Sequence, residues 1–250
     1  MRRRDLFLGF SALWAASQLR AIGPRSEISV GHVRHRGAWN PRPDALHRLL
    51  WETTKRTSIT TAQDAAVVDV ADGTTAESAE LFFQPLLILT AAGQMPPLEP
   101  KERSRLERHL RFGGTLVVDA PPTEQAFLSG IAKELAAIFP SIPLRPLPDD
   151  HVILKSFYLL EGAVGRFRHD RRLQALDLGG RAAVIVSSND LLGAWEKDAF
   201  GAFRFACEPD GENQRELAFR LGVNLMMYAT CIDYKEDQVH IPFIMRKKRR

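Results

Sequence analysis

The chain has 250 residues, of which 45% are hydrophobic and 26% are charged, and these proportions exclude a disordered or collagen-like chain. Its formal net charge of +4 comes from the two ends, because residues 1–21 carry +3 and Arg246–Arg250 carry +5, which leaves −4 for the remainder. Nucleic-acid binding is therefore not expected, since it requires a basic face on the folded domain.

Residues 1–21 predict an N-terminal export signal. Three arginines at positions 2–4 precede an apolar run from Leu6 to Ala16, shorter than the about 20 apolar residues that span a bilayer. Arg3-Arg4-Asp5-Leu6-Phe7-Leu8 resembles the twin-arginine motif, with one leucine inserted before the phenylalanine. We expect a periplasmic or exported protein. Two alternatives stay open. The segment could be an uncleaved inner-membrane anchor, which implies membrane proximity, or it could be the first helix of a cytosolic domain.

The next elements alternate between strand and helix patterns. Residues 28–33 predict a strand, and Asp44 is the expected N-cap of a helix over 45–56. Strands follow at 66–70 and 86–89, and the second of these is wholly apolar, as in a strand that is covered on both faces.

The same alternation continues in the second half. A helix over 100–112 begins at Pro100 and ends before Gly113-Gly114, and a buried strand covers 115–119. Thr123 is the expected cap of a helix that ends at Phe139, and a proline-rich connector follows it. A strand over 182–187 and a long helix over 212–229 complete the pattern, and the turn at Asn189-Asp190 is expected to cap a short helix between them.

This alternation predicts an α/β domain with a mainly parallel sheet and helices on both faces, over residues 28–230. Residues 231–250 form a C-terminal extension that ends in a basic tail. This tail is interpreted as a solvated, frayed end, and the alternative is that it contacts acidic lipid or a partner. Ligands of such sheets bind at the carboxyl ends of the strands. The polar or small residues expected there are His32, Thr90, Gly93, Asp119, Asn189 and Asp190.

Several segments together resemble the DUF4159 family. They are Arg36-Gly37-Ala38-Trp39-Asn40-Pro41, Leu89-Thr90-Ala91-Ala92-Gly93, Pro148-Asp149-Asp150-His151-Val152-Ile153, Ser156-Phe157-Tyr158, Ser187-Ser188-Asn189-Asp190-Leu191 with Trp195-Glu196, and Leu221-Gly222-Val223-Asn224. The resemblance implies a three-layer, flavodoxin-like fold similar to class I glutamine amidotransferases. It also implies MoxR-type ATPases and von Willebrand A-type proteins as partners. The sequence departs from the family's usual Thr-Gly-His-Gly at Thr90–Gly93, which implies a less polar pocket.

The position of the amidotransferase nucleophile carries no nucleophile in this sequence. The turn after the strand 115–119 reads Ala120-Pro121-Pro122, and the two cysteines, Cys207 and Cys231, lie in other segments, where buried or half-buried unpaired side chains are expected. No catalytic residue, metal ligand set or cofactor is therefore predicted, and a non-enzymatic role is favoured.

Three functional hypotheses remain. The first is a non-catalytic binding or assembly component of the bacterial cell envelope. The second is a hydrolase or metal-dependent enzyme that uses the acidic residues and His151 at the strand ends. The third is a carbohydrate-binding module that stacks sugars on Trp39 and Trp195. The ligand-binding candidates are Trp39, Asn40, Thr90, Gly93, Asp119, Asp150, His151, Asn189, Asp190, Trp195 and Glu196.

Overall fold

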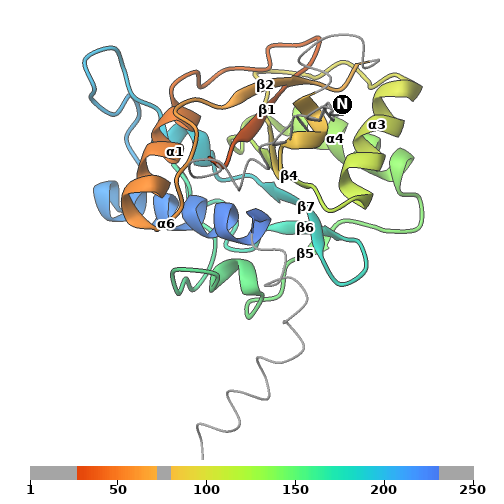
Figure 1. Ribbon diagram of the computed structural model, residues 1–250. Coiled ribbons are helices and arrows are strands. Elements are labelled where there is room, and N and C mark those ends of the chain that lie inside the picture. Colours follow the sequence, from red (N-terminus) through yellow and green to blue (C-terminus); the bar gives the residue numbers. More distant parts are fainter. Residues whose placement is uncertain (1–26, 72–79, 231–250) are drawn as a thin grey trace, which may run out of the picture.

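The computed structural model describes residues 27–71 and 80–230, which form a three-layer α/β domain (Figure 1). The seven strands form one sheet in the order β2-β1-β3-β4-β7-β6-β5. Their bounds are β1 Val30–Arg34, β2 Ala66–Asp69, β3 Leu86–Leu89, β4 Thr115–Asp119, β5 Arg145–Pro146, β6 Gln174–Asp177 and β7 Ala182–Ser187. The first five strands of that order are parallel, so the predicted mainly parallel sheet is confirmed.

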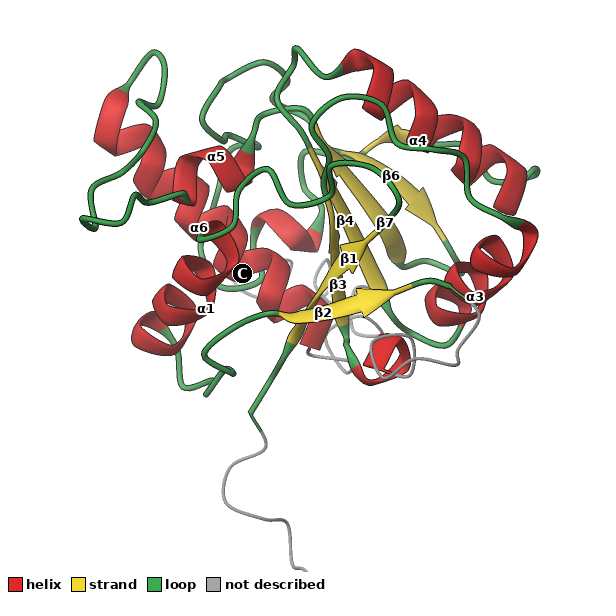
Figure 2. Cartoon of the chain, turned by 90° about the horizontal axis from the view of Figure 1, so that it is seen from above, coloured by secondary structure: helices red, strands yellow, loops and turns green. Residues whose placement is uncertain are grey.

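Helices cover both faces of this sheet (Figure 2). The α-helices are α1 Ala45–Arg56, α3 Pro100–Arg111, α4 Gln125–Ile138, α5 Leu191–Trp195 and α6 Gly211–Thr230, and the short 3-10 helices are η1 Leu81–Phe83 and η2 Val152–Leu154. Buried side chains of α1, α5, α6 and η2 share one core, and those of α3 and α4 share the other.

The strand β3 shows how one sequence run serves both cores. Its four residues are all buried, and Leu86 and Ile88 belong to the core under α1 and α6, whereas Leu87 and Leu89 belong to the core under α3 and α4. Side chains alternate between the two faces of a strand, so a strand with helices on both faces must be apolar at every position. This is the reason why the apolar runs in the sequence located the central strands correctly.

Of the two predicted helix caps, Asp44 is confirmed in position but not in its capping bond, and Thr123 is wrong. Asp44 occupies the N-cap position of α1, but its side chain makes no capping hydrogen bond. Instead its backbone N–H donates to Glu196 Oε2 at 3.1 Å, so a distant carboxylate supplies the acceptor. Thr123 is likewise not the cap of α4, because the helix begins at Gln125 and Glu124 holds the N-cap position without a side-chain cap. Local sequence predicts the start of a helix, but tertiary structure selects the acceptor there.

The antiparallel edge of the sheet was not predicted. β6 pairs antiparallel with β7, and the two-residue β5 pairs antiparallel with β6 inside the proline-rich connector. β6 reads Gln-Ala-Leu-Asp and carries only two buried side chains, so its sequence lacks the apolar run that identifies the central strands.

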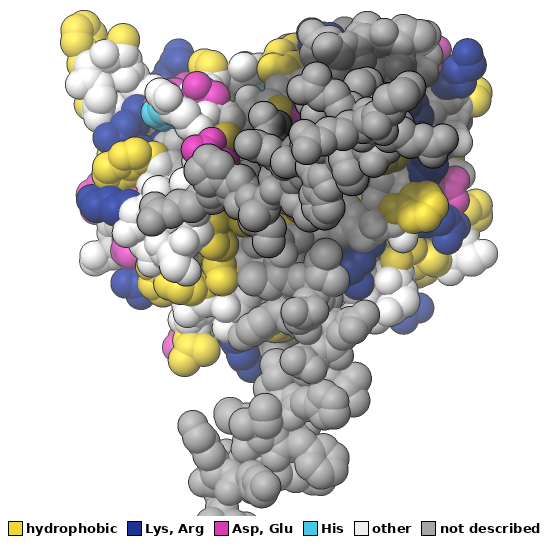
Figure 3. Space-filling model, in the orientation of Figure 1, with side chains coloured by type: hydrophobic (Ala, Val, Ile, Leu, Met, Phe, Trp, Pro, Cys, Tyr) yellow, Lys and Arg dark blue, Asp and Glu magenta, His cyan; other side chains and the backbone are white. Residues whose placement is uncertain are grey.

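The parallel strands β2-β1-β3-β4-β7 follow the order of flavodoxin-like sheets, in which ligands bind where the strand order reverses, between the first and third strands. In this chain that point lies at the carboxyl ends of β1 and β3. On the surface visible in Figure 3, described Lys and Arg side chains occupy separate spots among other residue types and form no continuous basic patch.

Two further sequence expectations concern Cys207 and membrane spans. Cys207 is a buried free thiol, as predicted, and burial raises its pKa, whereas Cys231 lies outside the described residues. Within residues 27–71 and 80–230, none of the helices has the length and apolar content needed to cross a bilayer. The predicted export signal lies in residues that the structure does not describe.

Candidate functional site

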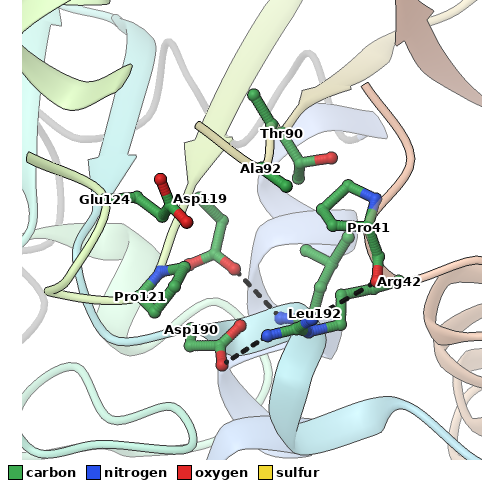
Figure 4. A pocket seen from close by; sticks show the side chains of 10 residues that line it. Pro41, Arg42, Thr90, Ala92, Asp119, Pro121, Glu124, Asp190 and Leu192 are labelled. Atoms are coloured by element: carbon green, nitrogen blue, oxygen red, sulfur yellow. Dashed lines mark hydrogen bonds and ion pairs between the residues drawn. The ribbon is translucent and has the colours of Figure 1, made fainter. Parts of the chain in front are cut away.

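A small cavity opens at the carboxyl edge of the sheet, at the point where the strand order reverses (Figure 4). Four strand ends build it, because its wall combines the segments that follow β1, β3, β4 and β7. The space within it that is open to the centres of water molecules is about 50 Å³. The lining residues are Pro41, Arg42, Thr90, Ala91, Ala92, Asp119, Pro121, Glu124, Asp190 and Leu192.

Asp119, the last residue of β4, is buried in this wall, with 2% of its surface exposed. Its Oδ2 accepts a hydrogen bond from the Leu192 backbone N–H at 3.0 Å, as the dashed line in Figure 4 shows. Its Oδ1 is buried and has no partner in good hydrogen-bonding geometry among the described residues, although the Leu191 N–H and the Ser187 hydroxyl are near enough to stabilise the carboxylate. A buried carboxylate oxygen without a partner is costly, so this atom needs an explanation.

The pKa of Asp119 is raised to about 7. Burial is the largest cause, and the negative charge of Asp190 adds to it. The backbone amides of Leu191 and Leu192 and the nearby hydroxyl of Ser187 partly offset these effects. Near neutral pH this carboxyl group therefore exchanges between its acid and its carboxylate form.

Asp190 forms another part of the cavity wall, and its side-chain oxygens all have hydrogen-bond or ion-pair partners. Its Oδ1 accepts from the Gly193 N–H and caps α5, which confirms the predicted turn and cap. Its Oδ2 accepts from Arg42 and from Arg166, each at 3.2 Å. The backbone of Asp190 is left-handed, with φ of 55°, a conformation that is uncommon outside glycine, asparagine and aspartate.

The two arginines that bind Asp190 share an aromatic support. The guanidinium carbons of Arg42 and Arg166 lie 4.4 Å and 4.8 Å from the centroid of the Phe205 ring. The Nε atoms of both arginines are buried and have no hydrogen-bond partner among the described residues. Arg42 also lines the cavity, so two residues of its wall, Arg42 and Asp119, each carry a buried polar atom without a hydrogen-bond partner among the described residues.

The rim is held by hydrogen bonds across the loops that follow β1 and β3. Thr90 is buried, and its hydroxyl donates to the Trp39 carbonyl oxygen at 2.8 Å. His32 Nε2 lies 3.2 Å from the same hydroxyl, and burial is the main cause that lowers the pKa of His32 to about 4. The Gly93 N–H donates to Glu124 Oε2 at 2.9 Å, and φ at Gly93 is +76°, where glycine is favoured. The rim is therefore fixed by Thr90 and Gly93.

Two predicted candidates are used within the fold. Asn189 is buried, and its Oδ1 accepts from the backbone N–H groups of His169 and Asp170 while its Nδ2 donates to the Asp170 carbonyl. Glu196 is 1% exposed and accepts from the Asp44 N–H, and burial raises its pKa. These side chains fix a loop and a helix start, so neither offers a free group to the cavity.

Asp150 and His151 do not lie at the carboxyl ends of the parallel strands. Asp150 is exposed, and His151 Nδ1 accepts from the Ile153 N–H at the start of η2. The His151 ring contacts the Tyr228 ring edge-on, and the Tyr228 hydroxyl accepts from the N–H of Ala182, the first residue of β7. These residues therefore lie by the opposite end of β7, and the predicted combination with Asp119 is wrong.

The two tryptophans and Asn40 are also placed away from a ligand-stacking arrangement. Trp195 ends α5, is 1% exposed and stacks against Phe219, so it presents no face to a sugar. Trp39 is half-buried with its ring 4.8 Å from that of His32, and Asn40 is exposed. A carbohydrate site that needs both rings is therefore contradicted.

The structure also adds residues that the sequence reading missed. Arg42, Glu124 and Leu192 line the cavity, and Arg166 reaches it through Asp190. Arg42 stands between two prolines directly after the Trp39 motif, which is a signal that could have identified it. Arg166 has no comparable signal, because only the fold brings its loop to β7. Within the described ranges, no three His, Cys, Asp or Glu side chains are grouped so that they could hold a metal ion.

Comparison with known families gives one match. The sequence model described as "Domain of unknown function (DUF4159)" matches residues 29–230. No curated protein matches the chain. The matched range contains every residue of the cavity.

Proposed function

Because the chain belongs to the DUF4159 family, a domain of unknown function, we propose its function from the cavity itself: the domain binds a small polar molecule and does so without covalent catalysis. The observation that carries this proposal is the buried Asp119 Oδ1, which has no hydrogen-bond partner in the cavity wall. A ligand that donates a hydrogen bond to this atom would remove the cost of leaving it unsatisfied.

The size and chemistry of the cavity limit what it can take. A cavity that holds one water molecule offers about 10–15 Å³ to the centre of that molecule. The corresponding volume of this cavity is about 50 Å³, which is room for a few heavy atoms. Two residues of the wall carry buried atoms without a partner, namely the acceptor Oδ1 of Asp119 and the donor Nε of Arg42. We therefore propose that the ligand, or the head group of a larger ligand, carries both a donor and an acceptor, as a carboxamide, a hydroxy acid or an amino acid does.

Binding without catalysis is favoured because the wall lacks a free nucleophile. Among the lining residues the only hydroxyl is that of Thr90, which donates to the Trp39 carbonyl. Position 120, where an amidotransferase-like scaffold would place its nucleophile, is a buried alanine.

The binding proposal is tested with a panel of small compounds. Acetamide, glycolate, glycine and acetate are titrated into the purified protein by calorimetry at pH 7. We expect at least one compound to bind, and we expect Asp119→Asn to weaken that binding at least about tenfold, since the variant offers a donor where the ligand needs an acceptor. The exposed Asp149→Asn serves as the matched control and should bind like the wild type. Equal affinities for wild type and Asp119→Asn would refute the proposal.

A second candidate function is acid–base catalysis by Asp119. A pKa of about 7 suits a group that must both take up and release a proton near neutral pH. Such an enzyme would activate a water molecule, because the wall supplies no nucleophile of its own. Hydrolysis of a panel of amides and esters, with a pH–rate inflection near 7 that disappears in Asp119→Asn, would support this alternative, and a flat profile in both proteins would reject it.

We propose that the domain acts in the bacterial cell envelope, together with MoxR-type ATPase and von Willebrand A-type partners. The support is the twin-arginine-like Arg3-Arg4 segment and the implied association of such domains with these partners. Fractionation of cells that express the tagged chain tests the location. Replacing Arg3 and Arg4 by lysine should retain the protein in the cytoplasm, and an unchanged distribution would contradict export by this route.

A further inference from the structure

An aromatic patch lies at the amino edge of the sheet, opposite the cavity. Phe83 and Phe112 are 77% and 82% exposed, and Phe82 beside them is partly exposed. η1 contributes Phe82 and Phe83 just before β3, and Phe112 follows α3 just before β4. These side chains line a shallow hollow together with Ala229 and Thr230. Clustered large apolar groups on a surface mark a site of interaction.

Two arginines of α3, Arg105 and Arg108, lie beside this patch. The guanidinium carbons of Arg108 and Arg105 lie 4.5 Å and 5.2 Å from the Phe82 ring centroid. Arg111 precedes Phe112 and lies over the Phe139 ring, at 5.4 Å from its centroid. Exposed aromatic rings beside arginine guanidinium groups combine an apolar contact with positive charge. That combination suits the boundary between acyl chains and anionic head groups.

Both ends of the described domain leave from the same edge. Ala229 and Thr230, the last residues of α6, line the hollow, so the C-terminal extension starts at the patch. Its last five residues are all basic. At the other end, Ile28 forms a bridge with Thr61 two residues before β1, which also places the N-terminal exit at the amino edge. The segment beyond it carries five arginines, three of them at positions 2–4, and an apolar run.

We propose that this edge docks on the surface of an anionic phospholipid bilayer. Phe83 and Phe112 enter the interface, Arg105 and Arg108 contact the head groups, and the basic tail adds electrostatic attraction. The consequence is a defined orientation. The cavity lies at the carboxyl ends of the strands and therefore faces away from the membrane, open to a soluble ligand or partner.

Vesicle sedimentation of the full chain tests this proposal. Vesicles of equal parts phosphatidylglycerol and phosphatidylcholine should bind the protein, and raising the salt concentration should weaken that binding. The double variant Phe83→Ser/Phe112→Ser should reduce the partition coefficient at least about tenfold, because two apolar side chains no longer enter the interface. The matched control, Phe200→Ser/Leu159→Ser, removes side chains that are 95% and 82% exposed elsewhere and should bind like the wild type.

Three results would overturn the proposal. Equal partition of the patch variant and the control variant would show that the chain ends alone bind the vesicles. Equal binding to vesicles of phosphatidylcholine only would remove the electrostatic part of the argument. A lower oligomeric mass of the patch variant in light scattering, with unchanged vesicle binding, would identify the patch as a contact between copies of this chain. Circular dichroism of each variant verifies that the fold is retained.

Discussion

Replacing Asp119 by asparagine should stabilise the folded protein at neutral and alkaline pH. The pKa of Asp119 is raised from 3.8 to about 7 in the folded domain, mainly by burial. The folded state therefore binds more protons than the unfolded state between these two values. Wild-type stability falls as the pH rises through this window and stays at its lowered level above about pH 7.

The expected size of this effect follows from the pKa difference. The pKa of Asp119 differs by roughly 3 between the folded and unfolded states, and at about 1.4 kcal/mol for each pKa unit this corresponds to about 4 kcal/mol of lost stability. Asparagine carries no titrating charge, and its side-chain oxygen can keep the hydrogen bond from the Leu192 N–H. The advantage of Asp119→Asn over the wild type should thus be near zero at pH 4 and approach about 4 kcal/mol at pH 8.

Urea denaturation of both proteins over a series of pH values measures this difference directly. Subtracting the wild-type free energy of unfolding at each pH removes the contributions of all other titrating groups. The exposed Asp149→Asn provides the control and should show no comparable trend. A difference between Asp119→Asn and the wild type that does not change between pH 4 and pH 8 would refute the reasoning about burial.

Three further predictions concern packing and acid stability. A Cβ atom on Gly193 would lie 2.2 Å from Asp190 Oδ2, so Gly193→Ala should lower the free energy of unfolding in urea by about 1–3 kcal/mol. A Cβ atom on Gly130 in α4 would meet nothing within 4 Å, so Gly130→Ala should raise that free energy by about 0.5–1 kcal/mol. The reverse order of the two variants would contradict the geometry. Trp195→Ala should cost about 3–5 kcal/mol, and a loss below about 1 kcal/mol would mean that the ring is not packed as described. Burial lowers the pKa of His109 from 6.5 to about 4, so this residue makes the fold less stable as the pH falls through that range, by about 3 kcal/mol in total. His109→Gln should remove the contribution of His109 to the slope of unfolding free energy against pH. Parallel slopes for the variant and the wild type would exclude this contribution.

The central architecture could be predicted from the sequence because each central strand is covered on both sides. Leu86–Leu89 and Thr115–Asp119 are fully buried strands, and the apolar runs Leu86–Leu89 and Leu116–Val118 mark them in the sequence. The edge could not be predicted in the same way. β5 consists of Arg145 and Pro146, both exposed, so no hydrophobic pattern marks them as strand residues.

The candidate site was predictable only where the residues follow a strand directly. Thr90, Asp119 and Asp190 were identified because parallel strands bring their carboxyl ends to one edge. Arg166 was missed, because it lies in a loop 24 residues before Asp190, and β6 and β7 come between the two residues. Asn189 was assigned to a ligand, but it holds the loop at His169 and Asp170. A buried asparagine in such a position has the same sequence pattern whether its partners are a ligand or a backbone.

The short antiparallel edge has a consequence for the behaviour of this protein at high concentration. An exposed strand edge offers unpaired backbone groups to other chains and so promotes aggregation. At β5 the pairing extends over only Arg145 and Pro146, and Pro146 has no N–H to donate. Pro148 follows two residues later and removes the next donor of that kind. A neighbouring molecule therefore finds no regular row of donors on this side, and growth of the sheet from one molecule to the next is blocked there.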